Sequence, residues 1–215
     1  MKTIVLKVDS NNPQPEIMKR AGEAIRKGEL VAFPTETVYG LAADAFNTEA
    51  VERVYVAKGR TANNPLPVQV ALIDEIGKLV TEIPEVAYRL MVAFFPGPLT
   101  LVLKASSKVP ELVSAGTGKV GIRMPDHPVA LALIREAGTP VVAPSANASG
   151  EPPPTTADDV LEYLDGKIEL VLDGGRTELG VASTVVDVTG PQLKVLRMGS
   201  IAVEMLARYA DSQVL

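Results

Sequence analysis

The stretch Leu30-Val31-Ala32-Phe33-Pro34-Thr35-Glu36-Thr37 indicates the fold class of this chain. Apolar residues that run up to a proline predict a short buried strand, and the polar residues after it predict a loop. The same pattern returns at residues 140–147, where Pro-Val-Val-Ala leads into Pro-Ser-Ala-Asn. Ligands of α/β proteins gather at the carboxyl ends of such strands. We therefore expect an α/β fold whose site chemistry lies on loops.

Helical and extended segments are interleaved on both sides of this stretch. Apolar spacing with caps and stops predicts helices over residues 16–26, 48–58, 84–95, 128–137, 156–164 and 201–209, with Thr48 and Thr156 as N-caps. Further strands are expected over residues 1–9, 66–72, 99–103, 120–124, 168–172, 184–188 and 193–196. No linker or repeat interrupts them. The sequence therefore predicts one α/β domain over residues 1–215, built on a mixed, twisted sheet.

The composition excludes several classes of site. The chain has 215 residues, no cysteine and one histidine, His127. Disulfides, thiolate nucleophiles and cysteine-based metal centres are therefore absent, and a Ser-His-Asp triad would depend on His127, for which we expect a capping or surface role. The net charge of -5, from 21 Lys and Arg against 26 Asp and Glu, disfavours nonspecific nucleic-acid binding. Any phosphate site must be a local cationic pocket.

Membrane insertion is not expected. No stretch reaches the ~20 apolar residues that a bilayer requires, and residues 92–103 are interrupted by Pro96 and Pro98. The apolar run near the N-terminus is too short for a signal peptide. We therefore expect a cytoplasmic protein.

Gly116-Thr117-Gly118-Lys119-Val120-Gly121 matches the Gly-x-Gly-x-x-Gly pattern of dinucleotide-binding folds. That pattern requires a helix after it, to aim backbone amides at a pyrophosphate. Here an extended segment that ends at Pro125 follows instead. We therefore interpret the motif as a turn.

Lys58-Gly59-Arg60 places two cations at the end of a predicted helix. Isolated pairs of this kind usually complement the helix dipole. Here a polar loop with Asn64 follows at once and leads into a strand, an arrangement in which a triphosphate fits against both side chains. On this motif alone both interpretations stay open.

Six motifs in one order resemble the YrdC-like threonylcarbamoyladenylate synthases over about residues 20–200. They are residues 33–41 (FPTETVYGL), 58–60 with 64–66 (KGR and NPL), 123–128 (RMPDHP), 143–147 (APSAN), 183–187 (STVVD) and 196–197 (LR). The resemblance implies an open, twisted, mixed sheet flanked by helices, with a concave ligand cavity. It also implies synthesis of threonylcarbamoyl-AMP and pyrophosphate from L-threonine, bicarbonate and ATP, for modification of the adenosine next to the anticodon in tRNA. Some members carry a further C-terminal domain, which we do not expect in this chain.

The resemblance also assigns roles to residues that are weak signals on their own. The catalytic cations would be Lys58 and Arg60. ATP would bind to Lys58, Arg60, Asn64, Ser145, Asn147 and Arg197, and threonine to Thr35, Thr37, Gln69, Arg123 and Ser183. Arg123 would clamp the amino-acid carboxylate. Mg²⁺ would come with ATP rather than bind to a site of the protein, and the product would pass to a tRNA threonylcarbamoyl transferase complex.

Three residues depart from the family pattern. Gln69 stands where a histidine is expected, Lys119 where a threonine is usual, and Pro153 where a serine is usual. Gln69 can still form a hydrogen bond with a substrate. Pro153 has no hydroxyl and Lys119 adds a charge, so we expect one nucleotide contact to differ.

Two other functions are kept as alternatives. One is the YrdC-like domain of hydrogenase maturation proteins, which forms a carbamoyl adenylate but belongs to longer chains with zinc-finger cysteines. The other is an RNA-binding module of the same fold. With a net charge of -5, four Phe and no Trp, the chain offers few phosphate contacts or stacking platforms, so only weak RNA binding is expected.

Overall fold

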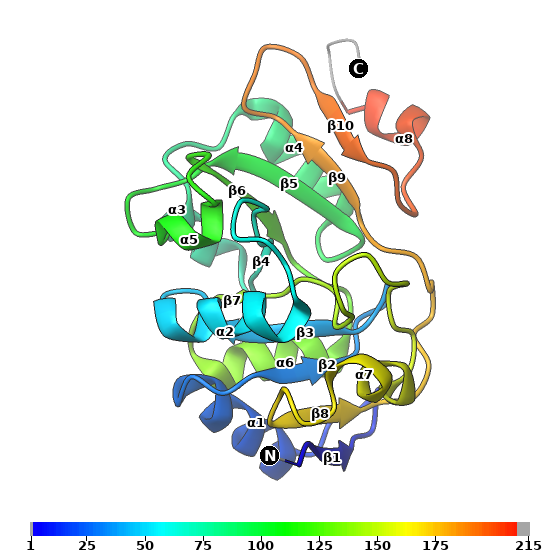
Figure 1. Ribbon diagram of the computed structural model, residues 1–215. Coiled ribbons are helices and arrows are strands. Elements are labelled where there is room, and N and C mark those ends of the chain that lie inside the picture. The colour runs from blue at the N-terminus through cyan, green and yellow to red at the C-terminus, as the bar shows by residue number, and fades with distance from the viewer. Residues whose placement is uncertain (1, 210–215) are drawn as a thin grey trace.

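A ten-stranded mixed sheet runs through the residues that the structure, a computed structural model, describes, which are residues 2–209 (Figure 1). Its strands are β1 (Ile4–Lys7), β2 (Val31–Phe33), β3 (Gly40–Asp44), β4 (Val68–Gln69), β5 (Leu99–Lys104), β6 (Lys119–Arg123), β7 (Val141–Val142), β8 (Leu170–Asp173), β9 (Thr184–Asp187) and β10 (Lys194–Arg197). Their order is β1-β8-β2-β3-β7-β4-β6-β5-β9-β10. Four of the pairs, β1-β8, β2-β8, β4-β6 and β5-β9, are parallel.

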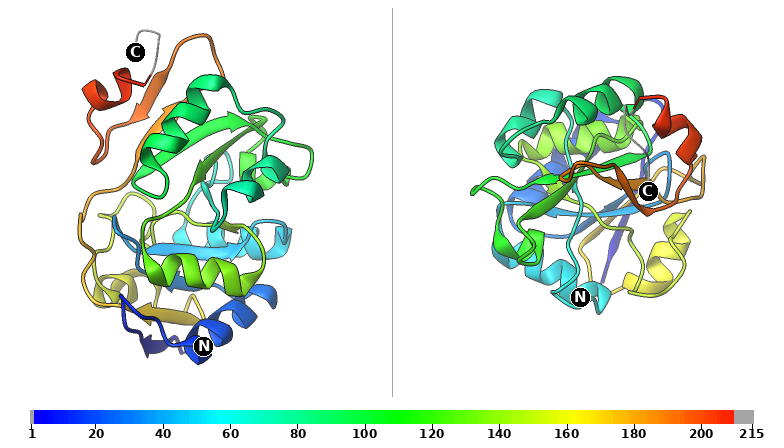
Figure 2. Two further views of the ribbon diagram at one scale, coloured as in Figure 1. Left: turned by 180° about the vertical axis from the view of Figure 1, so that it is seen from behind. Right: turned by 90° about the horizontal axis from the view of Figure 1, so that it is seen from above.

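Helices flank this sheet. They are α1 (Pro15–Arg26), α2 (Thr48–Lys58), α3 (Ile76–Leu79) after the short 3-10 helix η1 (Ile73–Glu75), α4 (Glu85–Phe94), α5 (Glu111–Ser114), α6 (Pro128–Ala137), α7 (Ala157–Leu164) and α8 (Val203–Ala207). Around the N-terminal strands, α1 and α6 lie on one face of the sheet and α2 and α7 on the other (Figures 1 and 2). The view from above in Figure 2 also shows the twist of the sheet. The expected α/β architecture is confirmed, while residues 1 and 210–215 of the predicted domain lie outside the described residues.

Strand β2 is buried on both faces, as its apolar run predicts. Val31 and Phe33 pack into a core formed with α1 and α6. Ala32 points to the opposite face, into the core that α2 and α7 share. A strand sandwiched between helices has no solvent-facing side, so it shows no apolar-polar alternation.

The sequence did not predict β3, the expected strand over residues 66–72 is too long, and one cap is misplaced. β3 is rich in small residues of low strand propensity, and it forms because it pairs with both β2 and β7. Only Val68–Gln69 of the expected strand pairs with neighbours. The N-cap of α2 is Asn47 rather than Thr48, since the Asn47 side chain accepts a hydrogen bond from the Ala50 amide at 3.1 Å.

Most other helix boundaries agree with the sequence to within a residue, although α8 is shorter than the helix expected over residues 201–209. The prediction for α6 is confirmed at both ends, with Pro128 in its first turn and Gly138 after its last. Thr156 is the N-cap of α7, and its hydroxyl accepts from the Asp159 amide at 3.2 Å. Short helices α3 and α5 have no clear periodicity and were not predicted. Within residues 2–209, no helix has the length and apolar character that crossing a membrane requires.

Candidate active site

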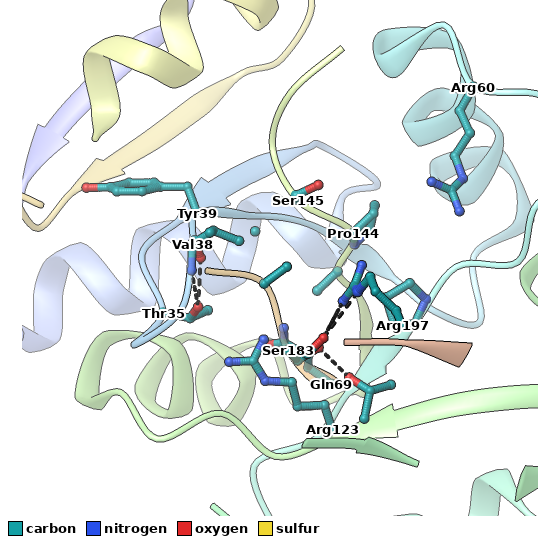
Figure 3. A pocket seen from close by; sticks show the side chains of 15 residues that line it. Thr35, Val38, Tyr39, Arg60, Gln69, Arg123, Pro144, Ser145, Ser183 and Arg197 are labelled. Atoms are coloured by element: carbon teal, nitrogen blue, oxygen red, sulfur yellow. Dashed lines mark hydrogen bonds between the residues drawn. The ribbon is translucent and has the colours of Figure 1, made fainter. Parts of the chain in front are cut away.

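Two adjoining cavities lie beside the central strands and the loops that follow β2 and β7, and Figure 3 shows the inner one. The inner chamber, of about 90 Å³, has a lining that is about equally polar and apolar, and its polar side chains include Thr35, Gln69, Arg123, Ser145 and Ser183. The outer chamber, of about 340 Å³, is lined in part by Asn64, Leu66, Lys119, Val185, Asp187 and Leu196. Arg60, Pro67, Thr100 and Arg197 line both chambers. The two chambers therefore adjoin each other at these four residues.

Three arginines from separate elements meet at this site. Arg60 follows α2, Arg123 ends β6 and Arg197 ends β10. Arg60 donates to the carbonyl oxygen of Pro65 at 2.9 Å, and Arg197 to that of Ser183 at 3.0 Å. Among the described residues, neither Arg60 nor Arg197 has a carboxylate within ion-pair distance. Their uncompensated charge makes the junction of the chambers a site for a polyanion.

The two cations of the Lys58-Gly59-Arg60 motif have different surroundings, because α2 ends between them. Gly59 has a φ of 59°, which a glycine adopts without strain, and it ends α2. The Arg60 amide donates to the carbonyl of Tyr55 at 3.0 Å across this turn. As a result, Arg60 lines both chambers, whereas Lys58 lines neither and is 3% exposed.

Lys58 holds the loop after β7. Its Nζ donates to the carbonyl oxygens of Ser145 and Asn147, the latter at 2.6 Å. The Ser149 amide donates back to the Lys58 carbonyl at 2.8 Å. In this structure Lys58 therefore fixes the loop that carries Ser145, and its direct phosphate contact stays a prediction.

The burial of Lys58 predicts a pH dependence of stability. Burial, with a smaller contribution from Arg60, lowers the pKa of Lys58 to about 7, against ~10.4 in an unfolded chain. Between these values the unfolded state binds more protons, so this group makes the free energy of unfolding rise with pH. Urea unfolding should show wild type gaining stability relative to Lys58→Met as pH rises from about 7 to about 10. A constant difference would contradict the lowered pKa.

The loop after β7 brings one of two predicted nucleotide contacts to the cavity. Ser145 lines the inner chamber. Asn147 lines neither chamber, and its Nδ2 donates to the carbonyls of Ala148 at 3.0 Å and Glu151 at 2.6 Å. Asn147 therefore braces the loop from within, and its predicted contact with ATP stays a prediction.

The loop after β2 presents one of its two threonines. Thr35 lines the inner chamber, and its hydroxyl donates to the carbonyl of Val38 at 2.7 Å (Figure 3). Thr37 is fully buried, with its hydroxyl 2.8 Å from that of Thr35. Thr37 therefore lies behind Thr35 and supports it rather than lining the cavity.

Polar groups from β4, from β5 and from the residue before β9 complete the inner chamber. The Ser183 hydroxyl lies 2.8 Å from that of Thr100 and 3.1 Å from Nη2 of Arg197 (Figure 3). Gln69 is 3% exposed, and its Oε1 is buried without a hydrogen-bond partner. A buried acceptor of this kind is available to a donor on a ligand. Thr100 was not predicted, although a lone threonine in the apolar strand β5 was a signal.

Arg123 is held by the protein on two edges. Its Nε donates to the carbonyl of Gly97 at 3.2 Å, and its Nη2 lies 2.8 Å from Oε2 of Glu36. This ion pair is buried, with side chains 7% and 9% exposed. Glu36 lines neither chamber and was not predicted as a site residue. Its position between two threonines in a loop after a buried strand was the available signal.

Lys119 and Arg123 project from the same side of β6, as strand alternation predicts. Lys119 lines the outer chamber and Arg123 the inner one. Nζ of Lys119 forms an ion pair with Asp187 at 2.8 Å. Lys119 is one of the residues that depart from the family pattern, and Asp187 therefore largely compensates the charge that it adds. Pro153, another departure, lines neither chamber.

His127 occupies the N-cap position of α6, but its side chain makes no capping hydrogen bond. The expected capping role is therefore wrong for the side chain, which is half-buried and has its Nδ1 buried without a hydrogen-bond partner. Burial lowers its pKa, and the nearby Glu36 opposes this effect. His127 lines neither chamber, so it is not placed for acid-base chemistry on a bound ligand.

A family model described as telomere recombination, and named for Sua5, YciO and YrdC, matches residues 23–199. The chain belongs to this family. The threonylcarbamoyl-AMP synthase of Pyrococcus abyssi is 47% identical over 206 residues, which are 96% of this chain and 60% of the relative. That of Bacillus subtilis is 49% identical over 201 residues, which are 93% of this chain and 57% of the relative.

The fold of the family is confirmed by a solved relative. The crystal structure of P. abyssi Sua5 complexed with L-threonine has a TM-score of 0.96 to this chain at 44% identity. The match covers 99% of this chain and 63% of that one. The chain thus spans about three fifths of the length of these members of the Sua5, YciO and YrdC family.

Proposed function

We propose that this protein is a threonylcarbamoyl-AMP synthase, which converts L-threonine, bicarbonate and ATP into threonylcarbamoyl-AMP and pyrophosphate. The observation that carries the proposal is an inner chamber with several polar side chains that adjoins a mostly apolar outer chamber at Arg60 and Arg197. The inner chamber suits an amino acid, the outer chamber suits a nucleoside, and the arginines suit the phosphates between them. The names of relatives at 47% and 49% identity support the same reaction.

For this reaction the protein has to position the substrates and neutralise their negative charge. The amine of threonine attacks the carbon of CO2 derived from bicarbonate and loses a proton, which gives a carbamate. A carbamate oxygen then attacks the α-phosphorus of ATP, and the bond from that phosphorus to the oxygen that bridges it to the β-phosphorus breaks, which releases pyrophosphate. The substrates supply both nucleophiles, so a chain without cysteine needs no triad for this reaction.

The phosphates of ATP would lie against Arg60 and Arg197, whose charges have no carboxylate partner among the described residues. Asn64 would contact the nucleoside from the outer chamber, and Ser145, which lines the inner chamber on the loop that Lys58 holds, would contact the phosphates of the nucleotide. Mg²⁺ would enter as part of MgATP. No group of three His, Asp or Glu side chains gathers within residues 2–209, so the phosphates would hold the ion.

Threonine would occupy the inner chamber. Arg123 would bind its carboxylate, since a planar guanidinium can donate two parallel hydrogen bonds. Thr35, Gln69 and Ser183 line the same chamber and would bind the polar groups of the amino acid. The unpartnered Oε1 of Gln69 is an acceptor for the threonine hydroxyl or amine. Thr37 would act through Thr35.

The test of this function is pyrophosphate release with each substrate omitted in turn. We expect release to require ATP, threonine and bicarbonate together. An RNA-binding module gives no release, and a carbamoyl-adenylating domain responds to carbamoyl phosphate instead of threonine. Full release without threonine contradicts the proposal.

The proposed product also indicates what consumes it. Threonylcarbamoyl-AMP is a mixed anhydride, whose carbonyl carbon is activated for transfer to an amine. We propose that a tRNA threonylcarbamoyl transferase complex in the cytoplasm takes it up for the adenosine next to the anticodon. RNA binding by this chain is not needed for the step that it would perform.

A further inference from the structure

Glu36 is a buried carboxylate that the proposed reaction leaves without a role. Its carboxylate oxygens are buried, and neither has a hydrogen-bond partner. Its ion-pair partner among the described residues is Arg123, with Nη2 and Oε2 2.8 Å apart. Burying a charge is costly unless an opposite charge accompanies it. The position of Glu36 therefore points to a function exerted on Arg123.

The contacts of Arg123 define the orientation of its guanidinium. Nε donates to the carbonyl of Gly97, and Nη2 lies within ion-pair distance of Glu36 but makes no hydrogen bond. Nη1 donates to no described residue, and it is not among the buried atoms that lack a partner. A hydrogen bond at one edge and an ion pair at another restrict the plane of a rigid guanidinium. Nη1 is then the edge that faces a ligand in the inner chamber.

Glu36 also makes the charge at Arg123 different from the charge at the other two arginines of the site. Arg60, Arg123 and Arg197 all line the inner chamber. Of these three, only Arg123 has a carboxylate partner within residues 2–209. An amino acid is a zwitterion with no net charge, whereas a triphosphate is a polyanion. The compensated arginine therefore matches the amino acid, and the two uncompensated arginines match the phosphates.

We propose that Glu36 is a positioning and specificity residue. It holds Arg123 for the amino-acid carboxylate and cancels the charge that would make Arg123 a site for inorganic anions. The proposal rests on the function proposed above. The buried ion pair of Glu36 and Arg123 thus discriminates the amino acid from phosphate-like anions.

The test compares Glu36→Gln with wild type in two titrations of pyrophosphate release. We expect the threonine concentration for half-maximal release to rise about tenfold. We also expect sulfate, used as the anion probe, to inhibit competitively against threonine at about tenfold lower concentration than in wild type. Glu36→Asp keeps the charge and should keep the exclusion of sulfate, with a smaller threonine defect.

Two further variants separate positioning from general damage. Glu169→Gln is the matched control, because Glu169 is also a partly buried carboxylate paired with an arginine, Arg53, but lies outside both chambers. It should leave both titrations unchanged. In an Arg123→Gln background, adding Glu36→Gln should raise the threonine requirement no further, because Glu36 acts through Arg123.

The outcomes distinguish this proposal from the proposed function. Loss of folded protein lowers apparent turnover without moving the threonine requirement. Glu36→Gln and Glu36→Asp could therefore lower turnover while the threonine requirement and the inhibitory sulfate concentration stay at wild-type values. That result means that Glu36 has a structural role, and it overturns the proposal. In that case threonine-dependent release by wild type still supports the proposed function. Wild type without threonine-dependent release overturns both.

Discussion

Replacing Arg60 by alanine is expected to lower turnover at saturating ATP by about 10²-fold or more. Arg60 lines both chambers and has no carboxylate partner among the described residues, so its charge is available to the phosphates. Negative charge shifts toward pyrophosphate as it leaves, and a fixed cation stabilises that charge most in the transition state. The measurement is the initial rate of pyrophosphate release with every substrate saturating.

Arg53→Ala is the control for this variant. Arg53 lies in α2, the helix that Arg60 follows, but it pairs with Glu169 and lines neither chamber. We expect Arg53→Ala to turn over at the wild-type rate. An unchanged rate for Arg60→Ala at saturating ATP would contradict its assignment to the transition state.

Arg123→Lys is expected to raise the threonine concentration for half-maximal pyrophosphate release about tenfold, equivalent to ~1.4 kcal/mol. Lysine keeps the charge beside Glu36, but it loses the hydrogen bond to Gly97 and cannot make two parallel bonds to a carboxylate. Titrations of threonine and ATP, each at saturating levels of the other, separate an effect on amino-acid binding from one on the nucleotide.

Lys119→Ala is the informative comparison on the same side of β6. Lys119 is paired with Asp187 and lines only the outer chamber, so its removal is expected to act on the ATP requirement or to do little. If Lys119→Ala carries the threonine defect and Arg123→Lys does not, the two roles are reversed.

The fold was predictable where local signals agree with packing. The buried run of β2, and the proline and glycine that bound α6, define those elements without reference to the rest of the chain. β3 carries no such signal, because small residues form a strand there only by pairing with β2 and β7. The strands predicted before Pro144 and over residues 66–72 are confirmed as β7 and β4, but each pairs over two residues only, a length that depends on its neighbours in the sheet.

The site was predictable as a set of residues but not as an arrangement. The ordered motifs pointed to Arg60, Arg123 and Arg197, which line the inner chamber together. They could not show that Lys58 turns away from Arg60 at Gly59, because that depends on a backbone angle. Nor could they show that Glu36 lies against Arg123, since the two residues are far apart in the sequence and meet only in the folded sheet.

The central claim is the identity of the product, and mass spectrometry of the nucleotides formed from ATP, threonine and carbon-13-labelled bicarbonate tests it most directly. We predict an adenylate that contains threonine and the labelled carbon, formed in step with pyrophosphate and absent when threonine or ATP is omitted. An adenylate without the labelled carbon, or the same product without threonine, would contradict the account.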